Sequence, residues 1–177
     1  PTDLFAFDEL ARILKREIQT AVVNDSLLFQ TIDRVYRRTE EISGFAKDLE
    51  RDLGDYIDFG ALGAGLGAED APVVKLLQTV FDDATQVNAS DVHIEPQETN
   101  VQIRFRIDGV LLPQTESDVK IGPAMVLRLK LMAGLDISEK RLPQDGRFAI
   151  IVRDLPVDVR MSTMPTQHGE SVVLRLL

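Results

Sequence analysis

The chain has 177 residues, enough for one average domain or two small ones, and 44% of them are hydrophobic, which suffices for a core. It has no cysteine, so disulfides and cysteine-ligated zinc are excluded, and no apolar run approaches the roughly 18 residues of a membrane-spanning helix. The net charge is uneven, because residues 1–100 carry 20 acidic and 9 basic side chains and residues 101–177 carry 9 and 11. The acidic first part argues against a broad nucleic-acid surface, which requires clustered lysine and arginine.

Residues 1–53 are expected to form a small α/β subdomain that is mostly helical. Apolar side chains recur there at helical spacing, and a short β-prone run at residues 18–23 interrupts them. Asn24 or Asp25 is expected to cap the helix that follows. Nothing in this part indicates catalysis. Because the chain starts at Pro1 without an initiator methionine, we interpret it as a piece of a longer protein.

Residues 54–71 are expected to be a flexible linker. They contain five glycines and no basic side chain. A phosphate-binding loop is the alternative for the glycines at 63, 65 and 67, but no Gly-Lys-Ser/Thr follows them. The acidic residues around this segment would also repel phosphate.

Residues 72–177 predict an α+β domain. A helix is expected to begin at Pro72 and another to span about residues 121–133. The alternating segment 101–107, the turn Asp108-Gly109 and three later strands indicate about six short strands joined mostly by hairpins. This pattern predicts an antiparallel sheet with helices on one side.

The last predicted hairpin places two arginines opposite each other. Its turn centres near residue 167, so that Arg160 and Arg175 should pair across the strands within one residue of register. Opposed like charges are destabilising unless a carboxylate or an external anion compensates them. Asp158 and Glu170 are the candidate internal partners. The residues alone leave an anion site and an internal ion-pair network equally open.

A second cluster could in principle hold a metal or perform acid–base chemistry. Asp91, His93 and Glu95 lie on one face of a predicted strand. A structural histidine is favoured over a metal site, since His168 is the only other histidine and no cysteine is available. The loop 141–147 has an arginine at each end, which could clamp a partner or the loop itself. Neither a nucleophilic triad nor a Walker-type loop is present in the sequence.

Four segments resemble the bacterial type II secretion and type IV pilus assembly ATPases: ASDVHIEP (89–96), RFRIDGVL (104–111), RLKLMAGLDISEKRLPQDGR (128–147) and VDVRMSTMPTQHGESVVLRLL (157–177). The resemblance covers residues 72–177 nearly without interruption. Residues 1–53 are similar to the end of the preceding N-terminal subdomain of that family. The pilus branch, including the mannose-sensitive haemagglutinin motor, and the secretion branch are not separated by these residues.

The resemblance implies a cytoplasmic homohexameric motor, peripheral to the inner membrane, in which residues 72–177 are a PAS-like second N-terminal domain. It implies that Arg160 and Arg175 contact ATP phosphates and couple hydrolysis to domain motion, whereas Arg147 and His168 are held as structural. Walker A and Walker B would lie beyond residue 177, so this part is expected to be inactive alone.

The resemblance also implies the cofactors and partners of the whole protein. ATP and Mg²⁺ would serve it, with none bound tightly by this part. The expected partners are the ATPase domain of the same chain, neighbouring subunits of the hexamer and inner-membrane platform proteins, with no nucleic acid. The alternative function is a non-catalytic interaction module that docks a platform partner.

Overall fold

The computed structural model describes residues 4–36, 39–53 and 72–177. Its elements in chain order are α1 (Leu4–Leu14), α2 (Asp25–Tyr36), α3 (Thr39–Leu53), α5 (Pro72–Gln86), β1 (Asp91–Pro96), β2 (Asn100–Ile107), β3 (Val110–Asp118), α6 (Ile121–Met132), β4 (Gln144–Val152), β5 (Leu155–Thr166) and β6 (Gly169–Leu176). By its contacts the chain divides into two compact units, residues 1–35 and 36–177. Over the described ranges, no helix is long and apolar enough to cross a membrane.

The first compact unit contains α1 and α2. Asn24 caps α2, because its Oδ1 accepts a hydrogen bond of 2.7 Å from the backbone N–H of Leu27. The β-prone run at residues 18–23 forms no strand in the described part of this unit. A strand needs a neighbour for its backbone N–H and C=O groups, and no other strand is present there to supply one. This unit is therefore helical over its described residues.

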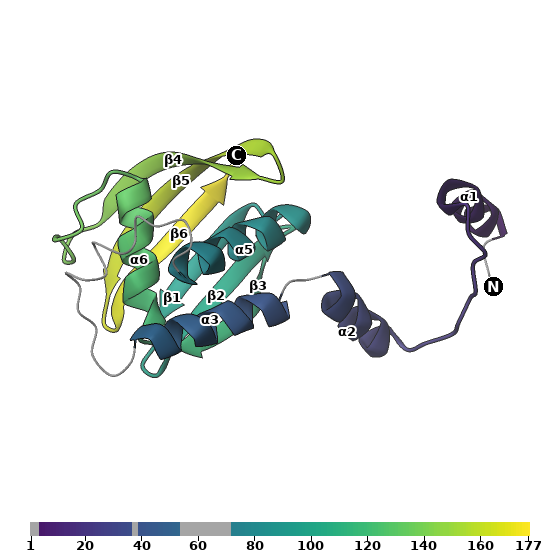
Figure 1. Cartoon of the computed structure of the whole chain (residues 1–177), viewed down its shortest axis with the longest axis horizontal. Helices are drawn as coiled ribbons and strands as arrows, with labels where there is room; N and C mark the ends of the chain where they lie inside the picture. The colour runs from purple at the N-terminus through teal and green to yellow at the C-terminus, as the bar shows by residue number, and fades with distance from the viewer. Residues whose placement is uncertain (1–3, 37–38, 54–71) are drawn as a thin grey trace. The chain divides into compact units, whose positions relative to one another are not determined.

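The second compact unit is built on one six-stranded sheet with the order β3-β2-β1-β6-β5-β4 (Figure 1). All neighbouring strands are antiparallel. Four of the pairs join strands that follow each other along the chain, whereas β1 and β6 come together from distant parts of the sequence. The predicted α+β fold, with about six antiparallel strands and helices on one side, is confirmed.

Two tight turns set the register of their hairpins. Asp108 and Gly109 have φ angles of 50° and 82°, and Arg153 and Asp154 have φ angles of 51° and 64°. Two consecutive positive φ values define the type I′ turn, whose twist matches that of the flanking strands. The first turn confirms the prediction at Asp108-Gly109. The second joins β4 to β5.

The hydrophobic core lies between the sheet and helices α3, α5 and α6, which cover one of its faces (Figure 1). Alternate strand residues point to these helices and are buried: Val92, Ile94, Val101, Ile103, Phe105, Val159, Met161, Val172 and Leu174. Phe81 of α5 meets Phe148 of β4 edge to face, with ring centroids 6.3 Å apart. Helices α3, α5 and α6 leave the opposite face of the sheet uncovered (Figure 1), and we call it the open face.

Helix α3 packs into this core. Its residues Ile42 and Ala46 are fully buried. The hydroxyl of Ser43 forms a hydrogen bond of 2.9 Å with the hydroxyl of Thr115 in β3. The second compact unit thus begins before α3, whereas the sequence placed residues 1–53 together and a new domain at residue 72. Those domain boundaries stay a prediction, and the predicted linker at residues 54–71 lies outside the described residues.

Candidate functional site

A line of charged side chains crosses the open face. Each member pairs with the next across neighbouring strands, in the order Arg106 (β2), Asp91 (β1), Arg175 (β6), Arg160 (β5) and Arg147 (β4). On its own strand, each of the five is next to a residue whose side chain faces the core. Successive side chains of a strand point to opposite faces, so all five point away from the helices. We call these five residues the arginine row.

The centre of the row was predicted from the sequence. Arg160 and Arg175 are directly opposed in the β5–β6 pair, as the position of the turn indicated. The turn itself is closed by Thr166, whose hydroxyl donates to the carbonyl of Gly169 at 2.9 Å. Both arginine side chains are exposed. Their opposition is confirmed, while their contact with nucleotide stays a prediction.

Asp91 is the acidic member of the row and the internal partner of Arg175. Its Oδ1 accepts a hydrogen bond of 3.0 Å from Arg175 Nε, and its Oδ2 lies 3.4 Å from Arg106 Nε. Its Oδ2 also accepts a hydrogen bond of 2.8 Å from the hydroxyl of Ser90. The Asp91 side chain is only 5% exposed, and burial by itself would raise the pKa of its carboxyl. The hydrogen bonds from Ser90 and Arg175 and the two guanidinium charges outweigh burial and lower that pKa.

The partners proposed from the sequence, Asp158 and Glu170, are therefore wrong for Arg175. Glu170 cannot reach it, because Glu170 and Arg175 are five positions apart on one strand and so point to opposite faces. Glu170 contacts Lys130 on the helix side instead. Asp158 faces Ala149 across the β4–β5 pair, beside the row rather than within it.

Arg160 and Arg147 differ from the other arginines of the row. Both are exposed, and within the described part of the chain neither side chain makes a hydrogen bond or an ion pair. They are also directly opposed to each other. Two adjacent positive charges without a carboxylate contact form a site that can accept an anion. The sequence analysis held Arg147 as structural, although the same hairpin arithmetic applied to the turn at Arg153-Asp154 would have placed it opposite Arg160.

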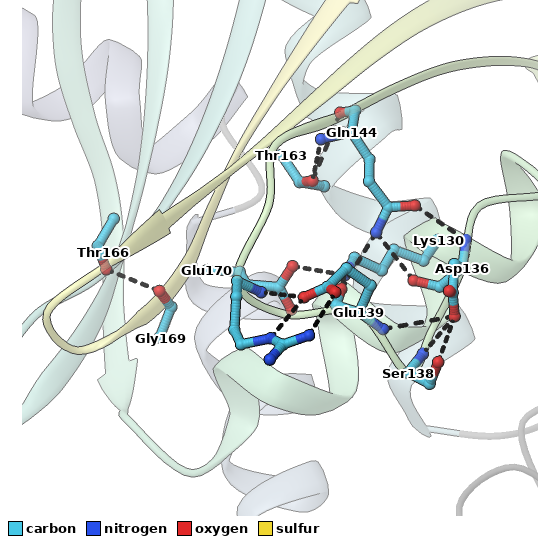
Figure 2. A network of polar contacts seen from close by, with 10 residues as sticks. Lys130, Asp136, Ser138, Glu139, Gln144, Thr163, Thr166, Gly169 and Glu170 are labelled. Carbon is cyan, nitrogen blue, oxygen red and sulfur yellow. Dashed lines mark hydrogen bonds and ion pairs between the residues drawn. The ribbon is translucent and has the colours of Figure 1, made fainter.

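A polar network on the helix side connects α6 and the loop that follows it to the starts of β4 and β6 (Figure 2). Lys130 of α6 is 1% exposed, and its Nζ lies 2.5 Å from Glu170 Oε1. The same Nζ donates to the carbonyl of Glu139 at 2.7 Å. Hydrogen bonds from the Arg141 side chain, and then from its backbone, lower the pKa of Glu139 to about 2. Lys130 thus joins helix α6, the loop that follows it and the start of β6.

Gln144, the first residue of β4, extends this network (Figure 2). Its side-chain amide donates to the carbonyls of Asp136 and Glu139, at 2.9 and 3.1 Å, and accepts from the Asp136 N–H at 2.9 Å. Its backbone N–H donates to the hydroxyl of Thr163 in β5 at 3.1 Å. These bonds thereby hold the loop before β4 against the residue pair Gln144 and Thr163, at the end of the β4–β5 hairpin that is far from its turn.

The second candidate cluster does not form a metal site. Asp91 is engaged by two arginines, and Glu95 pairs with Arg104 at 2.6 Å. His93 Nδ1 lies 3.3 Å from Glu95 Oε1. Over the residues that the structure describes, no three side chains of the metal-ligating types gather closely enough to hold an ion. Asp91, His93 and Glu95 are instead held in ion pairs and hydrogen bonds on the open face.

A cavity of about 600 Å³ lies on the helix side, between α6 and the β5–β6 turn. Its lining is mostly apolar and includes Val126 and Leu127, with His168 at the turn. The exposed His168 donates its backbone N–H to Thr166 Oγ1 at 3.3 Å. The cavity contains no member of the arginine row. It was not predicted from the sequence.

Comparison with known proteins agrees with the motifs. The model of the family described as "Type II/IV secretion system protein" matches residues 67–177. The chain belongs to this family. It is 39% identical over 186 residues to a type II secretion system ATPase E of Vibrio cholerae, covering 100% of this chain and 36% of that protein.

Two further relatives have similar identities. The chain is 40% identical over 184 residues to the type IV pilus assembly ATPase PilB of Myxococcus xanthus, covering 100% of this chain and 32% of that protein. It is 37% identical to a type II secretion system protein E of Pseudomonas aeruginosa, covering 99% of this chain and 36% of that protein. This member of the type II/IV secretion family therefore spans about a third of the length of the curated relatives it matches.

Proposed function

We propose that this chain is the N-terminal regulatory and nucleotide-contacting part of a hexameric ATPase that powers pilus assembly or type II secretion. Two observations support the proposal. The curated relatives are named as secretion and pilus assembly ATPases. In addition, Arg160 and Arg175 lie directly opposed and exposed on the open face of the sheet, where they can meet a ligand from another domain.

The proposed role of the two arginines is electrostatic. Guanidinium groups form bidentate, charge-assisted hydrogen bonds to phosphate oxygens. Arg175 is already held in place by Asp91, whereas Arg160 has no contact of this kind among the described residues. An ATP phosphate chain placed between them would relieve their mutual repulsion. Preorganised positive charge would also stabilise the negative charge that develops during hydrolysis.

The other elements of the proposal concern the whole protein. ATP and Mg²⁺ would be bound mainly by an ATPase domain of the same chain, and this part would change its position as hydrolysis proceeds. The assembly would be a homohexamer, located in the cytoplasm and peripheral to the inner membrane, where platform proteins are its partners. Membership of the family supports these statements, and each is testable on the full-length protein.

The test of the phosphate contact is ATP turnover by the full-length protein with Arg160→Ala or Arg175→Ala. We expect each change to lower turnover about 100-fold, since a preorganised charge at the phosphates is lost. Arg141→Ala is the matched control, because Arg141 is exposed and, among the residues that the structure describes, its ion pair is local, with Glu139. Turnover of both row variants at the level of this control would contradict the proposal.

The alternative function, an interaction module that docks a platform protein, has one observation in its favour. Helix α1 of the first unit exposes large apolar side chains: Phe5 is 91%, Ile13 60% and Leu14 57% exposed. Under this alternative, Phe5→Ser with Ile13→Ser would abolish binding to a purified platform protein, and the arginine variants would hydrolyse ATP normally. Loss of turnover with retained platform binding would favour the first function.

A further inference from the structure

We propose that Arg147 is a third phosphate-contacting residue, so that the anion site is a row of three arginines on β4, β5 and β6 rather than a pair. This inference rests on the proposed function, since it concerns the same phosphates. The observation that carries it is the continuous pairing of Arg147 with Arg160 and of Arg160 with Arg175 on one face of the sheet.

The first argument is reach. Neighbouring strands lie about 4.8 Å apart, so the outer two of three paired residues start about 10 Å from each other. Arginine side chains are long and flexible enough to converge from these positions on one phosphate chain. Arg160 stands in the middle and Arg147 lies on the edge strand β4, where a ligand can approach without crossing another strand.

The second argument is the availability of the charge. Asp91 engages both Arg175 and Arg106, and no corresponding carboxylate serves the β4 end of the row within the described residues. Asp145 and Asp158 lie on the same face, two positions from Arg147 and Arg160 along their strands, and the Asp145 carboxylate accepts a hydrogen bond from Ser162 rather than from an arginine. Arg147 and Arg160 are thus the two members of the row whose side chains have no carboxylate contact among the described residues, and an anion would be drawn to their end.

The third argument is the rigidity of β4 at this point. The preceding residue, Gly146, is packed so closely that a Cβ there would lie 2.9 Å from Ala133 Cβ. Gln144 and Thr163 fix the start of the strand pair, as described for Figure 2. The backbone under Arg147 is therefore held before any ligand binds. A preorganised cation of this kind contributes to phosphate binding with little loss of entropy.

The test compares steady-state ATP hydrolysis by the full-length protein with Arg147→Ala, Arg147→Lys and Arg160→Ala, with Arg141→Ala as control. We expect Arg147→Ala to lower kcat/KM about tenfold, the effect of one charge-assisted hydrogen bond. Arg147→Lys should recover part of it, because lysine keeps the charge and loses the bidentate geometry. Melting temperature should not fall, and hexamer formation should not change.

Three outcomes would overturn the inference. Normal kcat/KM with Arg147→Ala and reduced kcat/KM with Arg160→Ala would remove Arg147 from the site and leave the proposed function in place. Normal values for both would overturn the proposed function itself, and the inference with it. A lower melting temperature with Arg147→Ala, without recovery by lysine, would make Arg147 structural.

Discussion

Asp91 is the residue that holds one end of the arginine row in place. It is buried against the sheet and contacts the two arginines that flank it, one on β2 and one on β6. The ion pair with Arg175 links strands whose sequences are far apart, because the paired residues are 84 positions from each other. A single carboxylate therefore compensates part of the charge of Arg106 and Arg175, while the side chains of Arg147 and Arg160 have no carboxylate contact among the described residues.

The first prediction concerns pH. The pKa of Asp91 is lower in the folded chain than the value of about 3.9 for an unperturbed aspartate. Its ionised form thus contributes stability above that value, and the contribution is lost as the pH falls through the folded pKa. We expect Asp91→Asn to destabilise the fold by about 1 kcal/mol at pH 7, with the difference vanishing in strong acid. Urea unfolding at several pH values measures it, and a difference that grows on acidification would contradict it.

The second prediction separates the two predicted site arginines. Arg175→Ala should lower the free energy of unfolding by a few tenths to about 1 kcal/mol, since Asp91 loses a partner that is itself largely exposed. Arg160→Ala should leave it unchanged or raise it by about 0.2–1 kcal/mol, because repulsion with its neighbours is relieved. Thermal melts of the two variants in low salt compare them. Equal losses of stability would show that Arg160 also has an internal partner.

At the scale of elements, the buried Lys130–Glu170 pair joins helix α6 to the start of β6. The two side chains are 1% and 9% exposed. Burying a charged side chain costs free energy. This cost is offset only while both partners are present and further hydrogen bonds satisfy their remaining donors and acceptors. Lys130 has such a bond, to the carbonyl of Glu139. The pair therefore fixes the position of the loop before β4 relative to the sheet, in addition to any stability that it provides.

The third prediction follows from this pair. Lys130→Met alone, or Glu170→Gln alone, should destabilise the chain by about 3–5 kcal/mol, because each leaves a buried group without its partner. The double variant should lose clearly less than the sum of the two single losses. Chemical denaturation of the four proteins forms the cycle. Additive losses would show that the two charges act independently.

On the scale of the whole molecule, α3 belongs structurally with the sheet. It buries Ile42, Ala46 and Leu49 against the core that α5 and β3 complete. The sequence division at residue 53 separated α3 from these neighbours, since its dense charge resembles that of a solvated helix. Charge on the outer face and apolar residues on the inner face are both expected of a helix that covers a sheet.

The fourth prediction tests this assignment by truncation. A chain of residues 36–177 should melt close to the full 177-residue chain, whereas residues 72–177 alone should melt at a lower temperature because the core face under α3 becomes exposed. Ile42→Ala should cost about 2–5 kcal/mol. Ile32→Ala is the matched control, since Ile32 is 41% exposed. Equal melting of the two truncated chains would contradict the assignment.

The sequence by itself determined the local features of the second unit. Period-two alternation assigned the buried face of β2, and the turn at Asp108-Gly109 set its hairpin. The position of the last turn placed Arg160 opposite Arg175. These features are local, because a tight turn fixes the register of the two strands it joins.

Tertiary structure decided the rest. The pairing of β1 with β6 brings Asp91 to Arg175, and no turn connects these strands, so their register depends on packing of the whole sheet. The position of α3 on the core likewise depends on contacts between distant residues. Arg147 depends on both kinds of information. A local turn places it opposite Arg160, but its place in a row of three also requires that β6 pairs with β5. Long-range pairing is set by the burial of a common core, which no single segment of the sequence specifies.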